Sequence, residues 1–407
     1  MKQLIIRSFK IMDKWQRKVL LFLLCLLCLS CKGDMSLSGK EDNSNGLEQD
    51  ILKVIDEFKA IGISAVVIKN NHIVYSHSYG YNPVYSDTTL RVNIPSDGIY
   101  WLASVSKTFI STAIMQLVEK KKLKLDDDVN EYLKFTVKNP YYPDVPITVR
   151  MLLCHRSSIN DNHYEWTLKM MDSKTFKEYN ECFNDYRPGT EYDYCNLNYS
   201  LLGAIIESVT GLRFDQYIDK NICEPLGFKA SFNLTKMDST RLVRTLTYDK
   251  SEQRFKVNLS IFNYKYVEEK LKDYQLGWST ASLSPAGGMR MTALDLAKWT
   301  LVHMNYGEYE GVRIISKESE LDMWKPQGTV GNYGFAFSQY PSVVIGENLR
   351  GMTGGSHGIH SLMFFEPEKK FGFVVICNGC TCGGNGGKMN YEIVRLLYKY
   401  LIEEKWL

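Results

Sequence analysis

The chain has 407 residues, of which 44% are hydrophobic and 23% are charged, so it can bury a core large enough for one big domain or two modest ones. Its formal charge of +3 is misleading, because the first 30 residues hold six basic side chains and one acidic one, and the remaining 43 basic and 45 acidic residues give a net charge of −2. A nearly neutral body gives no electrostatic reason to expect nucleic acid as a partner.

The N-terminal segment, residues 1–30, is typical of an export signal. A basic stretch precedes eleven apolar residues from Val19 to Leu29, which is too short for a membrane-spanning helix of about 20 residues but suits a signal peptide. The run ends in Leu-Ser-Cys, which resembles a bacterial lipoprotein signal, and this resemblance implies that Cys31 carries the lipid. An ordinary signal peptide with an incidental cysteine, or an uncleaved anchor, is the alternative.

The segment that follows, residues 31–48, is polar and lacks hydrophobic periodicity, which predicts a tether. Residues 49–407 are then predicted to form one domain outside the cytoplasm, held to a bacterial membrane in the cell envelope.

Patterns at both ends of this domain predict a single sheet. Apolar residues recur at helical spacing from Ile51 to Phe58 and again from Ile393 to Leu401. Strand-like stretches lie beside each helix, at 63–68 with 73–76 and at 361–365 with 371–376, and each pair reads as an antiparallel hairpin. Residues from about 126 to 284 read as helices and long loops. We expect an α+β fold, with an antiparallel sheet flanked by helices, a mainly helical inserted region and a cleft between them.

A serine and a lysine stand together at the predicted start of a helix. Ser104 and Lys107 lie three residues apart, and Ile110 and Ile114 continue a helical stripe, so the pair shares one face. A hydroxyl becomes a nucleophile when a base takes its proton, and a desolvated lysine can be that base. Alone the pair is a weak signal, because an N-capping serine followed by a surface lysine gives the same pattern.

Two further motifs accompany the pair. Tyr194 and Asn196 lie in a Tyr-Cys-Asn turn that runs directly into an apolar helix, and Gly351-Met-Thr-Gly-Gly355 precedes the strand at 361–365. Three motifs in this order are much more specific than any one of them.

With these motifs the chain resembles the class C β-lactamase and penicillin-binding-protein group of serine hydrolases, which includes D-alanyl-D-alanine carboxypeptidases, D-aminopeptidases and family VIII carboxylesterases. The resemblance extends from about residue 50 to the end of the chain. It is carried by the phrases LASVSKTFISTAIMQLVE, ITVRMLLCHRSSI, PGTEYDYCNLNYSLLGAIIESVTG, YIDKNICEPLGF and PAGGMRMTALDLAKW. It implies a β-lactamase/transpeptidase-like fold and a hydrolase that uses no metal or organic cofactor.

The resemblance also implies a role for each residue of the first two motifs. Ser104 is the nucleophile that becomes acylated, Lys107 is its neighbouring base, and Tyr194 is the second proton carrier. Whether Lys107 or Tyr194 takes the first proton stays open, because such coupled groups titrate together. Asn196 is implied to bond Lys107 and a substrate carbonyl.

The third motif departs from the family pattern at its first residue, where Met352 replaces a lysine or histidine. Thr353 and Gly354 match the family pattern, so the strand of the third motif is still expected. The resemblance implies that the backbone N–H groups of Ser104 and Gly355 form the oxyanion hole. Methionine offers no charge for a carboxylate, the group that β-lactams and peptide C-termini share. We therefore expect an esterase or D-amino-acid peptidase rather than an efficient β-lactamase.

Two other catalytic readings find little support in the sequence. Ser356 lies in a G-x-S-x-G pattern like the nucleophile elbow of α/β-hydrolases, but only His357 and His360 follow it and no strand-to-helix context surrounds it. We interpret both histidines as loop residues, with replacement of the missing cation at Met352 as the alternative. The seven histidines have no metal-ligand spacing.

Seven cysteines remain when the signal segment and the lipid site are left out. An odd number at irregular spacing is not typical of a disulfide framework. Cys377, Cys380 and Cys382 cluster after an apolar strand. They offer three ligands, whereas a structural metal site usually needs four. Their disulfide state stays open.

The alternative from a different class is a non-catalytic binding or sensor lipoprotein built on the penicillin-binding-protein scaffold. Retention of all four polar residues of the first two motifs favours catalysis, since a protein that only binds need not keep them.

Overall fold

The computed structural model describes residues 41–84, 87–165, 167–328, 332–382 and 386–403. The expected signal segment, Cys31 and most of the expected tether lie outside these residues. Helix α3 (Glu41–Glu57) begins within the segment predicted as a tether, so the last eight residues of 31–48 are helical rather than irregular. Within the described ranges no helix is both long enough and apolar enough to cross a membrane. Residues from Leu47 onward form one compact unit.

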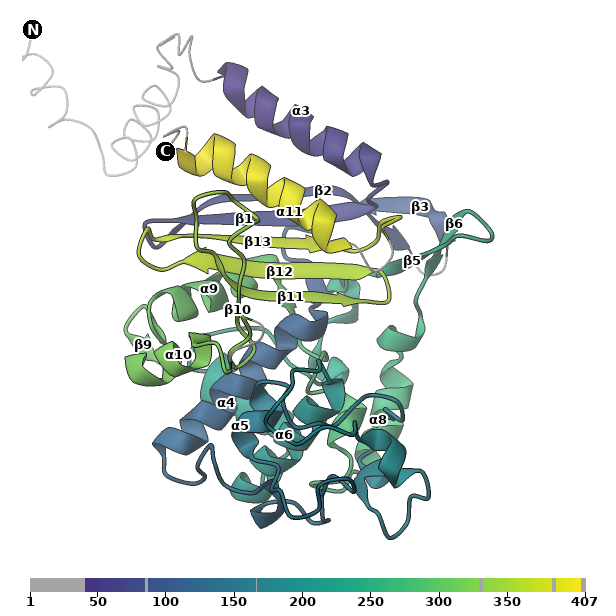
Figure 1. Ribbon diagram of the computed structural model, residues 1–407. Helices are drawn as coiled ribbons and strands as arrows, with labels where there is room; N and C mark the ends of the chain where they lie inside the picture. Colours follow the sequence, from purple (N-terminus) through teal and green to yellow (C-terminus); the bar gives the residue numbers. More distant parts are fainter. Residues whose placement is uncertain (1–40, 85–86, 166, 329–331, 383–385, 404–407) are drawn as a thin grey trace, which may run out of the picture. The chain divides into compact units, whose positions relative to one another are not determined.

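A seven-stranded antiparallel sheet is built from both ends of this unit, as predicted (Figure 1). Its strand order is β10 (Ser338–Gln339), β11 (Arg350–Ser356), β12 (Ile359–Glu366), β13 (Phe371–Cys377), β1 (Gly62–Lys69), β2 (His72–Val84) and β3 (Asp87–Asn93). Both predicted hairpins form, and β1 pairs with β13 in a register that sets Ile63 opposite Cys377 and Val67 opposite Phe373.

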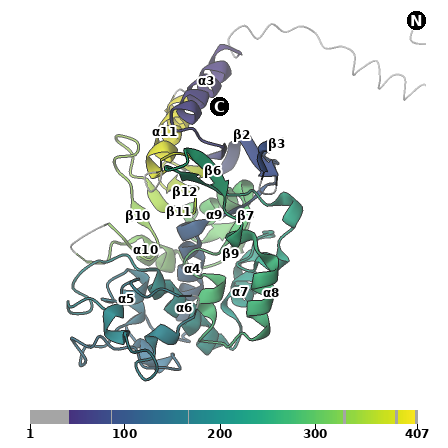
Figure 2. The ribbon, with the colours of Figure 1, turned by 90° about the vertical axis from the view of Figure 1, so that its right-hand side faces the viewer.

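Helices cover both faces of the sheet, which explains why β1 and β13 are almost continuously apolar and buried. Residues Ile63 and Val67 of β1 pack in one cluster with Ile393 of α11 (Gly386–Tyr398) and Ile51 of α3. The alternate residue Val66 belongs to a second, larger cluster on the other face. Figures 1 and 2 show α11 on one side of the sheet and α9 (Ala293–Met304) with the helical region on the other.

The region below the sheet is mainly helical. Its longer helices are α4 (Lys107–Glu119), α6 (Asn196–Thr210), α8 (Tyr264–Lys272) and α10 (Lys317–Trp324), with two short helices, α5 (Val149–Leu153) and α7 (Phe214–Ile218). The remaining described strands form three small pairs: β4 (Ile99–Trp101) with β7 (Arg290–Thr292), β5 (Leu246–Asp249) with β6 (Arg254–Val257), and β8 (Glu308–Tyr309) with β9 (Val312–Arg313). Just after β13, Cys380 and Cys382 are joined by a disulfide, whereas Cys377 is free.

Candidate active site

Ser104 lies in a short 3-10 turn, Ala103–Ser106, that leads directly into α4. The turn is held from two sides, because Leu102 donates its N–H to Met289 O (2.9 Å) and accepts the Ser361 hydroxyl at its carbonyl (2.7 Å). Ala103 has a φ of +47°, a conformation that L residues rarely adopt. A strained backbone held by its surroundings is common where a reactive side chain must be aimed.

The Lys107 side chain is fully buried and its amine contacts three oxygen atoms. Nζ lies 2.8 Å from Asn196 Oδ1, 2.9 Å from Ala286 O and 3.2 Å from Ser104 Oγ. Burial lowers the pKa of Lys107 from 10.5 to about 7, against the opposing effect of the Asp161 charge. A neutral amine has two N–H groups, which suit the two carbonyl oxygens, and its lone pair is then left for the proton of Ser104.

Tyr194 lies on the other side of the same pair. Its ring centroid is 4.8 Å from Lys107 Nζ, and its hydroxyl forms a hydrogen bond with Ser104. Desolvation by its neighbours raises the pKa of Tyr194, and the bond with Ser104 opposes this only partly, although 36% of the residue is exposed. The phenol is therefore protonated at neutral pH and can donate a proton.

His155 backs the Tyr194 ring, with ring centroids 4.3 Å apart, and was not singled out from the sequence. Its Nδ1 accepts the backbone N–H of Cys195 at 3.2 Å, so Nε2 carries the proton and faces the Tyr333 hydroxyl at 3.3 Å. Complete burial lowers the pKa of His155 well below its usual value, so this histidine supports the tyrosine as an uncharged ring.

Asn196 is the first residue of α6 and bridges Lys107 to a carboxylate that the sequence analysis missed. Its Nδ2 donates to Asp161 Oδ2 at 2.8 Å while its Oδ1 accepts from Lys107. The phrase ITVRMLLCHRSSI, on which part of the resemblance depends, ends at Ile159, two residues before this aspartate. Its place in a polar loop, just after a sequence segment that resembles the family, was the only signal that could have pointed to Asp161.

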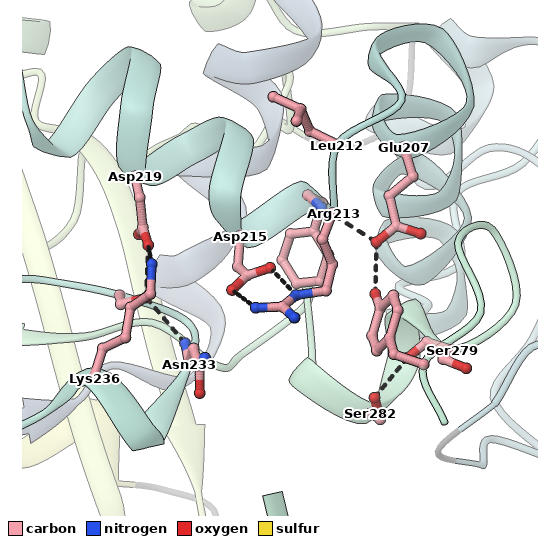
Figure 3. A network of polar contacts seen from close by, with 12 residues as sticks. Glu207, Leu212, Arg213, Asp215, Asp219, Asn233, Lys236, Ser279 and Ser282 are labelled. Atoms are coloured by element: carbon pink, nitrogen blue, oxygen red, sulfur yellow. Dashed lines mark hydrogen bonds and ion pairs between the residues drawn. The ribbon is translucent and has the colours of Figure 1, made fainter. Parts of the chain in front are cut away.

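The far end of α6 is held by a separate polar network (Figure 3). Glu207 accepts the Tyr274 hydroxyl at 2.5 Å and the N–H of Gly277 at 2.6 Å, and Arg213 forms a two-point ion pair with Asp215. Burial raises the pKa of Glu207 to about 7. This network contains no residue of the three motifs, so we interpret it as support for the helix.

Strand β11 supplies the third motif to the site along its open edge. Strand β10 pairs only with Arg350 and Gly351, so the described strands leave the β11 edge from Met352 to Ser356 without a partner. A Cβ atom on Gly354 would lie 2.4 Å from Leu102 O and 3.0 Å from Ser104 N. Only a glycine at position 354 therefore lets this strand approach the Ser104 turn so closely.

Met352 and Thr353 point to opposite faces of β11. The Met352 side chain is 3% exposed and packs in the large core, so it offers no cation to the site. The Thr353 hydroxyl forms a hydrogen bond with Tyr340, which follows β10. The place of the family's charged residue is thus filled by an apolar side chain.

Neither His357 nor His360 replaces that charge through a described contact with Ser104 or Lys107. His357 is exposed at the tip of the β11–β12 hairpin. Its Nδ1 lies 2.7 Å from Ser356 Oγ, and its ring lies tilted beside Trp101 with the centroids 5.6 Å apart. Burial lowers the pKa of His360, so its ring is uncharged at neutral pH. Ser356 itself ends a strand of a β-hairpin rather than entering a helix, which is not the geometry of a nucleophile elbow.

The described structure thus brings Ser104, Lys107, Tyr194 and Asn196 together and sets the edge of β11 against them, which defines the site architecture of the Ser-x-x-Lys serine hydrolases. Among the described residues, no group of three metal-ligating side chains comes together.

The comparison with known sequences agrees with this architecture. The sequence profile of the Beta-lactamase family matches residues 51–396, and the chain belongs to that family. The penicillin-binding protein homologue of Pyrococcus abyssi, an octamer, superposes with a TM-score of 0.69 at 28% identity, over 88% of this chain and 78% of that one.

Curated relatives include PbpX of Bacillus subtilis, named as a penicillin-binding protein, which is 29% identical over 85% of this chain and 78% of its own. The Flp protein of Staphylococcus aureus MRSA252 is 25% identical over 78% of this chain, which spans only about 59% of that relative. The D-amino acid amidase of Ochrobactrum anthropi shares the fold, with a TM-score of 0.66 at 18% identity, over 87% of this chain and 99% of that one.

The titration of Lys107 generates the first prediction. Because only the neutral amine can accept the Ser104 proton, reactivity at Ser104 should rise with pH through about 7 and then level off. Below that pH it should fall about tenfold for each pH unit. The measurement is the pH dependence of kcat/KM for an uncharged ester. An acid limb near pH 10, the range of an ordinary lysine, would contradict it.

Proposed function

We propose that this protein hydrolyses esters or amides of D-amino-acid type through an acyl intermediate on Ser104. The observation that carries the proposal is the buried Lys107 amine, 3.2 Å from the serine hydroxyl and without an ion-pair contact of its own in the described structure. A lysine that has lost most of its affinity for a proton next to a hydroxyl has the chemistry of a general base.

In the first half-reaction, Ser104 Oγ attacks the carbonyl carbon and its proton passes to Lys107 Nζ. The negative charge that develops on the carbonyl oxygen is stabilised by the N–H groups of Ser104 and Gly355, which act as preformed dipoles. The tetrahedral intermediate collapses when the bond to the leaving group breaks. Tyr194 gives its proton to that leaving group and regains one from the Lys107 ammonium.

In the second half-reaction, water attacks the acyl carbon and the same groups accept its proton. The bond to Ser104 Oγ then breaks, the serine is reprotonated and the acid is released. The pKa directions support this division of labour, because burial lowers the pKa of Lys107 and raises that of Tyr194, which leaves a base and an acid side by side.

Substitution at the pair tests the mechanism. With p-nitrophenyl butyrate and the purified full chain, Ser104→Ala and Lys107→Ala should each lower kcat by at least about 1000-fold, because each removes a reacting group. Ser356→Ala is the matched control and should leave the rate within about twofold, since Ser356 lies outside the proposed machinery. Equal rates in the wild type and both variants, or no turnover in any of them, would favour the non-catalytic binding protein.

The buried Met352 supports a preference for acyl groups without a carboxylate. We propose that neutral esters and D-aminoacyl amides are better substrates than β-lactams, because no described side chain at the Met352 position attracts the carboxylate that β-lactams carry. The names of the neighbours agree with this substrate class, since one of them is a D-amino acid amidase.

Exchange of Met352 tests this preference. Met352→Lys should raise kcat/KM for the β-lactam nitrocefin about tenfold relative to the neutral ester, since a cation near an anion gains about 1 kcal/mol or more at such sites. Met352→Leu controls for the change of volume and should leave the ratio unchanged. An unchanged ratio in Met352→Lys, in a variant that still turns over the ester, would show that Met352 does not determine the preference.

We further propose that Cys31 carries a lipid that holds the protein on a bacterial membrane outside the cytoplasm. The apolar run before Leu-Ser-Cys supports this, although the segment lies outside the described residues. Cells that express the full chain should incorporate radioactive palmitate into it, and Cys31→Ala should abolish the incorporation. Equal labelling of the two would point to another site.

A further inference from the structure

We propose that Asp161 is a positioning residue, which orients the Asn196 amide toward Lys107 and acts on the amine both through that amide and through its own charge. Asp161 lies in the loop between α5 and α6, outside all three sequence motifs. The inference rests on the proposed acylation of Ser104, and it assigns a role to a residue that does not itself reach the serine.

The carboxylate of Asp161 receives four donors from the start of α6. Oδ2 accepts the backbone N–H and the side-chain Nδ2 of Asn196, each at 2.8 Å. Oδ1 accepts the N–H of Leu197 at 2.9 Å and the thiol of Cys195 at 3.2 Å. All four partners are donors, so the ionised form of the carboxylate fits the contacts, and it also complements the positive end of the helix.

These contacts decide which end of the Asn196 amide faces the lysine. With Nδ2 bound to Asp161, Oδ1 is left to accept from Lys107 Nζ at 2.8 Å. In the reversed orientation the amide oxygen would face a carboxylate and the amide N–H groups would face the N–H groups of the amine. Asp161 therefore excludes the reversed amide, and Lys107 keeps the acceptor that directs its lone pair toward Ser104.

Among the charged groups, Asp161 has the largest electrostatic effect on the Lys107 amine. The other titratable groups that face Lys107 in the described structure are the rings of Tyr194 and Tyr199, the Cys195 thiol and His155. Burial raises the pKa of Tyr194, Tyr199 and Cys195 and lowers that of His155, so these four groups are uncharged near neutral pH. A negative charge at Asp161 favours the protonated amine and so raises the pKa of Lys107.

Charge and geometry can be separated with two substitutions. Asp161→Asn removes the charge and permits the reversed amide, so kcat should fall about 10- to 100-fold and the acid limb of kcat/KM should move about one pH unit lower. Asp161→Glu keeps the charge and displaces the carboxylate, so kcat should fall while the acid limb stays at the wild-type pH.

The matched control is Asp215→Asn, which removes a buried carboxylate beyond the far end of α6, where Asp215 pairs with Arg213 (Figure 3). It should lower the melting temperature without moving the acid limb. If Asp161→Asn lowers kcat and thermal stability in proportion but leaves the acid limb unmoved, Asp161 supports the fold alone and the proposal is wrong.

A measurement of the Lys107 pKa that needs no substrate keeps this test independent of the proposed function. The pKa of the Lys107 amine can be followed by ¹³C NMR of the full chain labelled at lysine Cε, with the resonance assigned from Lys107→Gln. A lower pKa in Asp161→Asn than in the wild type supports the role of the charge even in a protein that hydrolyses nothing. Equal pKa values in the two proteins would overturn the role of the charge, whatever the rates. If Asp161→Asn does not fold, Asp161→Ser, which also removes the charge, takes its place in this comparison.

Discussion

The burial of the Lys107 amine, which forms no direct ion pair with any described residue, is the constraint on which the arrangement of this site depends. An amine that water does not reach must find its hydrogen-bond partners inside the protein. Lys107 finds them on its own turn, on α6 some 89 residues later, and at Ala286, 179 residues later. Three segments that are far apart in the chain must therefore dock before the amine is satisfied, and their docking is what assembles the site.

The sheet takes part in this assembly through the turn that carries Ser104. Leu102 is bound by Ser361, a residue 259 positions later on β12, so the C-terminal half of the sheet fixes the start of α4. The neighbouring strand can come this close because Gly354 has no side chain at the point of contact. The sheet is therefore part of the geometry of the candidate site, since β11 and β12 both lie against the turn that carries Ser104.

The sequence was sufficient to predict the sheet, because its strands are local apolar runs whose hairpins are short and whose end helices are periodic. It was also sufficient to single out Ser104 and Lys107 as a pair at a helix start. The family resemblance carried by the three motifs together made them, with Tyr194 and Asn196, the candidate site residues. Asp161 and His155 could not be selected in this way. Their significance comes from contacts with residues more than 30 positions away. His155 lies within the phrase ITVRMLLCHRSSI and Asp161 just after it, but neither position has a spacing that points to a role. The burial of Met352 was equally invisible, because the alternation of a strand does not reveal which face meets the larger core.

The same burial that lowers the pKa of Lys107 opposes folding. Because its folded pKa is lowered from 10.5 to about 7, the unfolded chain binds the proton more tightly, and the cost is on the order of 5 kcal/mol below pH 7 and disappears as the pH rises toward 10.5. Glu207, whose folded pKa is raised from 4.5 to about 7, acts in the opposite sense, with a cost of about 3 kcal/mol that is absent at low pH and complete above pH 7. The two costs are therefore largest together near neutral pH, where the proposed chemistry needs the free amine. Native proteins are only marginally stable, so the large apolar core around α4 and α6 must compensate for these two costs. The same packing keeps water away from the Lys107 amine and so keeps its pKa low.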